Sequence, residues 1–187
     1  MSARILRYVA FGLAMLYAVL GGAFVIGETF ADPGGAAAAG LVASWLVPLV
    51  ALVALVLLRP DRAATVLVWV TGAVVVFVLL AGTLVDPRGQ TGPMGAIAVF
   101  ALAVALAFHG VRRPRPAGML LVAAAAALVV AALLDAAVHG HRTGIGGSAA
   151  AVVLPVLVIG GLFLLAGALE HRTTGPQGEV RVRPSAR

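Results

Sequence analysis

The chain has no cysteine and no lysine, and it has few charged residues of any kind. The lack of cysteine excludes disulfides, thiolate metal sites and thiol redox chemistry. Charged residues make up 11% of the 187 positions, whereas ordinary soluble domains contain about 25%. Hydrophobic residues make up 62%, and the mean hydropathy is +1.11. So few charges cannot cover the apolar surface of a soluble domain, so we predict an integral membrane protein.

All thirteen basic residues are arginine, and they give a formal net charge of +6 and a pI of about 11.5. In a soluble protein this balance would suggest nucleic acid. Here the arginines stand at the ends of long apolar runs, where a bilayer has its headgroups. The sequence therefore predicts the lipid bilayer as a partner and no nucleic acid.

Six apolar runs are long enough to cross a bilayer, which takes about 17–25 residues. They cover about residues 8–26, 36–58, 63–85, 93–109, 118–138 and 149–169. Backbone groups in hydrocarbon must be hydrogen-bonded within their own segment, so each run is expected to be a helix. We predict an all-α bundle of six transmembrane helices over residues 1–170. The polar remainder, residues 171–187, is predicted to be a disordered basic tail.

The arginines predict the orientation of this bundle. The two termini and the second and fourth loops hold eleven of them, and the alternate loops hold only Arg88 and Arg142. The positive-inside rule then places both termini in the cytoplasm and the protein in the cell membrane. A cleaved signal peptide is a competing interpretation of the first run, but the apolar stretch over 9–26 is longer than a signal peptide requires.

Two polar sequences recur at one displacement. Asp32-Pro33 returns as Asp86-Pro87 and Arg59-Pro60 returns as Arg113-Pro114, in both cases 54 residues later. This spacing favours three degenerate two-helix hairpin repeats related by an axis along the membrane normal. A second interpretation stays open, since short membrane loops often reuse the same turn residues.

The acidic residues gather at the predicted outer face. Glu28, Asp32, Asp86 and Asp135 lie there on the orientation above, and His139 follows Asp135 by one helical turn. Three of the spans end at this face, and a carboxylate beside the C-terminal end of a helix is disfavoured by a few tenths to about 1 kcal/mol.

Two explanations of these residues are open. They form a cation or proton site, or they are solvated turn residues and arginine partners, as the Asp-Pro pairs by themselves would suggest. The spacing of Asp135 and His139 does not constitute a metal-binding motif.

No pattern for catalysis is found. A Gly-x-Ser-Gly nucleophile, a His-Glu-x-x-His zinc helix and a Gly-rich phosphate loop are all missing from the sequence. The four histidines stand at the ends of the apolar runs, not in the middle where a haem ligand is expected. We therefore predict no catalytic residues, no cofactor, no metal and no enzymatic activity.

Two classes of function remain. The first is a non-catalytic accessory, scaffold or partner-binding protein, which would contact another membrane protein or a second copy of itself. The alternative is a small ion- or proton-coupled transporter or channel with the acidic residues in an outer vestibule. A transport path needs polar groups at mid-membrane, and Ser44 and Thr71 are the only ones near the middle of a run. This shortage favours the first class.

Overall fold

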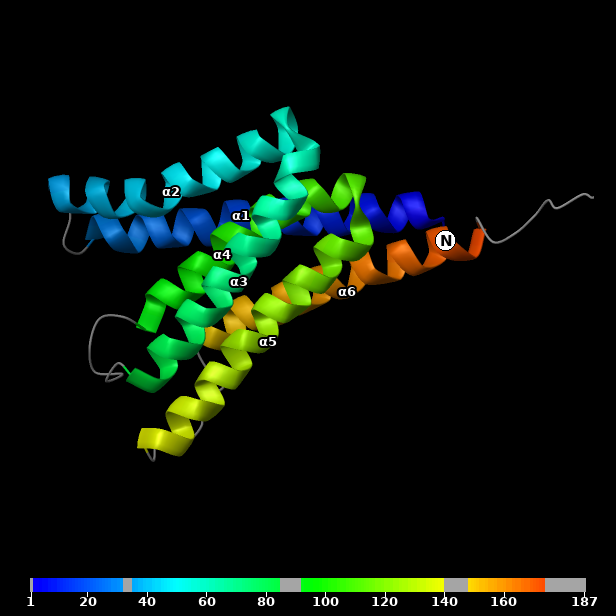
Figure 1. Cartoon of the computed structure of the whole chain (residues 1–187). Coiled ribbons are helices and arrows are strands. Elements are labelled where there is room, and N and C mark those ends of the chain that lie inside the picture. The colour runs from blue at the N-terminus through cyan, green and yellow to red at the C-terminus, as the bar shows by residue number, and fades with distance from the viewer. Residues whose placement is uncertain (1, 32–34, 85–91, 140–147, 174–187) are drawn as a thin grey trace, which may run out of the picture.

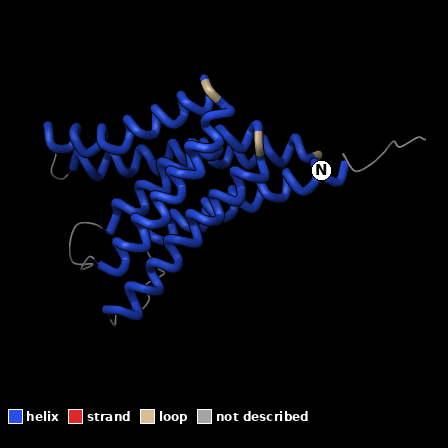
Figure 2. The backbone as a smooth tube through the Cα atoms, in the orientation of Figure 1, coloured by secondary structure: helices blue, strands red, loops and turns tan. Residues whose placement is uncertain are grey.

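The fold is an all-α bundle (Figures 1 and 2). The computed structural model describes residues 2–31, 35–84, 92–139 and 148–173. All six predicted runs form helices. They are α1 (Ala3–Ala31), α2 (Gly35–Leu58), α3 (Pro60–Leu84), α4 (Gly92–Arg112), α5 (Pro114–His139) and α6 (Ser148–Thr173). Five of them are long and apolar enough to cross a membrane, and the apolar part of α4 within the described side chains, Ile97–Arg112, is shorter.

Several helices extend beyond the apolar runs that predict them. α1 begins at Ala3, ahead of the apolar run, and continues through Glu28 to Ala31. It stops directly before Asp32-Pro33, as expected because a residue that precedes proline disfavours the helical conformation. α6 continues to Thr173, so the first residues of the predicted tail are helical, and residues 174–187 lie outside the described part. Hydropathy detects the part of a helix that suits hydrocarbon, not its hydrogen-bonded ends.

The six helices form three hairpins that open in the same direction. In Figure 1, α1 with α2, α3 with α4 and α5 with α6 turn back on the same side of the molecule. The start of α1, the end of α6 and the α2–α3 and α4–α5 corners lie on the opposite side. The hairpins converge at these corners and fan apart toward their tips (Figure 1).

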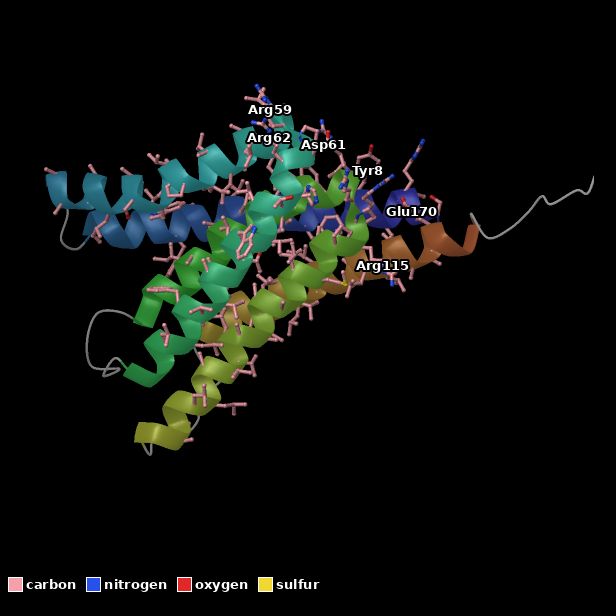
Figure 3. All side chains as sticks on the ribbon, viewed as in Figure 1. Tyr8, Arg59, Asp61, Arg62, Arg115 and Glu170 are labelled. Atoms are coloured by element: carbon pink, nitrogen blue, oxygen red, sulfur yellow. The ribbon has the colours of Figure 1, made fainter. Side chains whose placement is uncertain are left out.

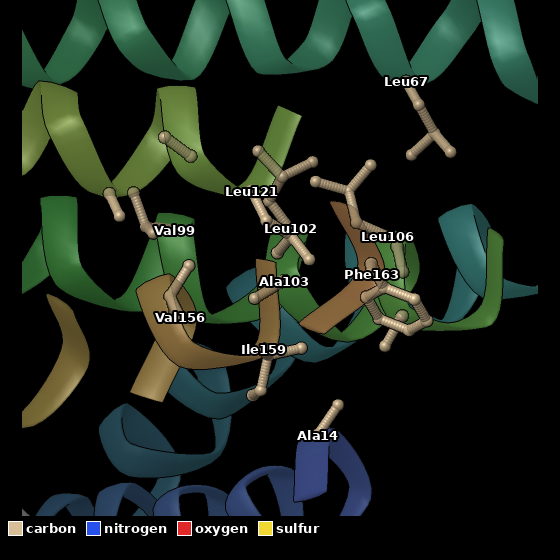
Figure 4. Close-up of a cluster of buried hydrophobic side chains, with 14 of the residues drawn as sticks. Ala14, Leu67, Val99, Leu102, Ala103, Leu106, Leu121, Val156, Ile159 and Phe163 are labelled. Atoms are coloured by element: carbon tan, nitrogen blue, oxygen red, sulfur yellow. The ribbon is translucent and has the colours of Figure 1, made fainter. Parts of the chain in front are cut away.

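α4 is the central helix. It packs against every other helix, and each of its residues from Val99 to Ala107 is buried. Leu102 and Leu106 of α4 meet Leu121 of α5 and Phe163 of α6 in one apolar cluster (Figure 4). Helices in lipid associate mainly through such close packing, because lipid tails are as apolar as the side chains and no hydrophobic effect drives the helices together.

α5 and α6 pack most closely, because glycine lines their contact. A Cβ added at Gly118 would lie 2.8 Å from both the Gly160 carbonyl oxygen and the Leu164 nitrogen. At Gly167 an added Cβ would lie 2.8 Å from the Cβ of Arg115. Small residues at these positions let the two backbones approach.

α3 and α5 bury corresponding positions. Each of three buried residues on α3 has a buried counterpart on α5, 54 residues later. The pairs are Ala63 with Ala117, Leu67 with Leu121 and Thr71 with Ala125. Both stripes have four-residue spacing, so each faces the core from one side of its helix.

α2 is the least buried of the five long apolar helices. Ala38 and Val56 are its buried residues and face the bundle. The side facing away carries small residues, including Gly40 and Ser44, and nothing lies within 4 Å of a Cβ added at Gly40. The Gly40-x-x-x-Ser44 pair suits close helix contact, but no helix in the described part of the chain covers it.

Candidate functional site

The predicted outer site can be placed only by its helices. Glu28 lies in the last turn of α1, and Asp135 and His139 lie in the last turns of α5. Their side chains, and all of Asp32 and Asp86, lie outside the described residues. The helical positions agree with the argument that acidic residues stand near C-terminal helix ends. The cation or proton site itself stays a prediction.

Two polar side chains near the middle of the helices bond within their own helix. The hydroxyl of Thr71 donates to the carbonyl of Leu67 at 2.6 Å, and that of Ser44 donates to the carbonyl of Leu41 at 2.7 Å. Each of these hydroxyls has therefore already used its single donor within its own helix. Among the described side chains, no three His, Asp or Glu residues are grouped to hold a metal ion.

Every charged side chain that the structure describes lies at one end of the bundle, which we name the charged end (Figure 3). It is formed by the start of α1, the two corners and the end of α6. Its residues are Arg4, Arg7, Arg59, Asp61, Arg62, Arg112, Arg113, Arg115 and Glu170. Tyr8 is exposed beside them (Figure 3).

The two corners of the charged end have the same local structure. At Arg59-Pro60 and at Arg113-Pro114 a single arginine separates two helices, and proline occupies the first helical position, where no N–H is needed. We name these the Arg-Pro corners. Their backbone bonds are Arg59 N to Leu55 O (2.8 Å), Ala63 N to Arg59 O (2.9 Å), Arg113 N to His109 O (2.9 Å) and Ala117 N to Arg113 O (3.4 Å). The corners thus repeat each other in hydrogen bonding as well as in sequence.

The Arg-Pro corners also contact each other. Pro60 has no backbone N–H, so it cannot donate the helical hydrogen bond to the carbonyl of Val56, four residues earlier. Arg112 supplies a replacement, and its Nη1 donates to that carbonyl at 3.2 Å. Nearby, Nη2 of Arg113 lies 3.4 Å from Oδ1 of Asp61. The pair is exposed, so it contributes little to stability, but both contacts fix the corners side by side.

α1 and α6 are joined at the charged end by a less exposed pair. Nη1 of Arg7 lies 3.2 Å from Oε1 of Glu170. His109, in the last turn of α4, is almost completely buried, with 2% of its side chain exposed. Its Nδ1 has no hydrogen-bond partner within the described part of the chain.

Tyr17 of α1 makes a contact with α6 that the sequence did not predict. Pro155 interrupts the hydrogen bonds of α6 and frees the carbonyl of Ala151 four residues earlier. The hydroxyl of Tyr17 on α1 donates to this carbonyl at 3.3 Å, and its ring meets Phe100 of α4 edge to face at 5.3 Å. An interior proline indicates a free carbonyl, but only the tertiary structure shows which helix supplies the donor.

The described residues therefore hold one well-defined polar region, the charged end. Away from it, Tyr17, Ser44 and Thr71 each donate to a backbone carbonyl. A comparison of the chain with protein families, curated proteins and solved structures finds no match.

Proposed function

We propose that this chain is a non-catalytic protein of the cell membrane that binds a transmembrane helix of another membrane protein through the outward side of α2. The charged end would lie in the cytoplasm, because the arginines gather at this end of the bundle and arginine-rich loops stay on the cytoplasmic side.

The single observation that carries this proposal is the outward side of α2. Within the bundle this helix is the least covered, and a band of small exposed residues runs along it at spacings of three and four. The band consists of Ala36, Ala39, Gly40, Ala43, Ser44, Pro48 and Ala51. Small residues in this pattern let two helix backbones approach closely, which is how helices associate in lipid.

The centre of the bundle argues against a transport path. The middle of α4 is buried from Val99 to Ala107, and every one of these residues is apolar. Thr71 is buried next to this core, but its hydroxyl is bonded to its own helix. An ion that crosses the membrane needs groups that replace its water, and the described centre offers none.

A small ion- or proton-coupled transporter is the second candidate. It is favoured by the position of Glu28 and Asp135, which lie at helix ends on the side opposite the charged end. Ionisable residues near spans often mark ion paths. In this case flux through reconstituted vesicles would depend on both residues.

Site-specific photo-crosslinking in intact cells tests the proposal. A photoreactive residue at Val47, a large exposed side chain beside the band, is expected to yield an adduct of defined mass with another membrane protein. The matched control is Val158 on α6, another exposed valine. It should yield lipid adducts only.

Two further changes sharpen the test. Gly40→Leu should abolish capture from the photoreactive residue at Val47, since the larger side chain separates the backbones. Gly161→Leu, at an exposed glycine of α6 with nothing within 4 Å of an added Cβ, should not. If the photoreactive residues at Val47 and Val158 give the same adducts, the outward side of α2 only contacts lipid and the proposal fails. An adduct made of two copies of this chain would contradict the proposed partner and show that α2 binds a second copy of the chain.

A further inference from the structure

The paired Arg-Pro corners present more positive charge than their neighbours neutralise. Between them they hold Arg59, Arg62, Arg112, Arg113 and Arg115, and the one described carboxylate among them is Asp61. Asp61 is paired with Arg113, and Arg112 is bonded to the Val56 carbonyl. Arg59 and Arg62 are both exposed, and neither has an acidic partner among the described residues. Figure 3 places them together at the α2–α3 corner.

Apolar surface lies directly beside these two arginines. Leu58 immediately precedes Arg59 and is 78% exposed, and Leu57 is 50% exposed. A dissolved anion or an acidic peptide would contact the arginines alone. A phospholipid has a phosphate for the guanidinium groups and an acyl chain for the leucines.

We infer that Arg59 and Arg62 at the Arg-Pro corners bind the phosphate of an anionic phospholipid. Guanidinium groups suit phosphate because they donate in a planar fork, and basic residues between membrane helices are a known means of binding anionic headgroups. The contacts of Arg112 and Arg113 with the neighbouring corner hold the two corners in place. The inference requires that the bundle lies in a bilayer, but it does not depend on a partner at α2.

Native mass spectrometry of the full chain in mild detergent tests this site. The protein is titrated with phosphatidylglycerol or with zwitterionic phosphatidylethanolamine of the same acyl chains. Wild type is expected to retain phosphatidylglycerol preferentially. Arg59→Gln with Arg62→Gln should weaken its apparent affinity by about tenfold or more, because each arginine contributes to the attraction of an anionic headgroup.

A matched double variant removes the same charge elsewhere on the charged end. Arg4 and Arg115 are also exposed, on α1 and on the side of α5 that meets Gly167. Arg4→Gln with Arg115→Gln should leave the affinity within about twofold of wild type, since neither residue belongs to the α2–α3 corner. Equal losses in the two double variants would overturn the site and leave only a general effect of charge.

Two additional measurements guard against misfolding and against a soluble ligand. Arg59→Lys with Arg62→Lys keeps both charges but loses the planar fork, so its affinity should fall between those of wild type and the glutamine variant. An affinity as low as with glutamine, together with a lower thermal midpoint in detergent, would show that the corner, not a phosphate contact, was damaged. Inorganic phosphate at millimolar concentration should not displace phosphatidylglycerol. Displacement by inorganic phosphate, or equal retention of the two lipids, would contradict the inference.

Discussion

At the scale of single residues, proline-freed carbonyls organise the polar contacts between helices. Pro60 frees the carbonyl of Val56 and Pro155 frees that of Ala151. In each case a donor from another helix takes the place of the missing N–H, Arg112 at 3.2 Å and Tyr17 at 3.3 Å. A carbonyl without a donor is costly in hydrocarbon. The replacement donors therefore stabilise the contacts of α4 with α2 and of α1 with α6.

Tyr17→Phe tests the contact with α6. Removing the hydroxyl leaves the Ala151 carbonyl without this donor while the ring contact with Phe100 is kept. We expect a loss of about 0.6–1.5 kcal/mol in unfolding free energy, measured as a lower thermal midpoint in detergent.

The double variant tests whether the proline is the cause. In Pro155→Ala the backbone N–H of residue 155 can bond the Ala151 carbonyl. In that background Tyr17→Phe should cost clearly less than it does alone. Equal costs in both backgrounds would mean that the hydroxyl does not act on the freed carbonyl.

At the scale of helices, the seam between α5 and α6 is held by glycine. Gly118→Ala would place a Cβ 2.8 Å from two backbone atoms of α6, and backbone cannot move aside as a side chain can. Overpacking of this kind costs about 1–3 kcal/mol, seen as a lower thermal midpoint. Gly161→Ala, which meets nothing within 4 Å, should be neutral or stabilising. The same drop in both variants would indicate that the seam is not closely packed.

The sequence predicted the helices better than their arrangement. Apolar length was enough to find all six, because the bilayer imposes a fixed thickness. It could not identify α4 as the central helix, since its apolar side chains differ little from those of helices that face lipid. The donors Arg112 and Tyr17 were missed for a related reason. Proline marks the carbonyl that is freed, but the helix that comes near it depends on packing.

The predicted outer site shows what sequence spacing cannot supply. Helix positions place Glu28 and Asp135 near the ends of α1 and α5, as apolar length and Asp-Pro turns suggested. Whether carboxylates share a cation depends on distances across hairpin tips that fan apart (Figure 1). Such distances follow from helix crossing angles, which nearly uniform apolar helices do not encode in their composition.

At the scale of the whole molecule, charge is distributed along one axis. The described arginines all lie at the charged end, together with the start of α1 and the end of α6. Moving arginine through hydrocarbon is costly, at about 2.5–3.5 kcal/mol per residue on insertion scales. The charged end should therefore stay on the side where the chain is made, the cytoplasm.

Single cysteines test this orientation cleanly, because the chain has none of its own. Ser2→Cys marks the charged end, and Ala31→Cys marks the opposite end, where α1 ends; both positions are exposed. A membrane-impermeant maleimide should label Ala31→Cys in intact cells and Ser2→Cys only after permeabilisation. Unmodified protein, treated in parallel, should take no label. Labelling of Ser2→Cys in intact cells would reverse the bundle, put the lipid-binding corners outside, and remove the positive-inside argument from the proposed function.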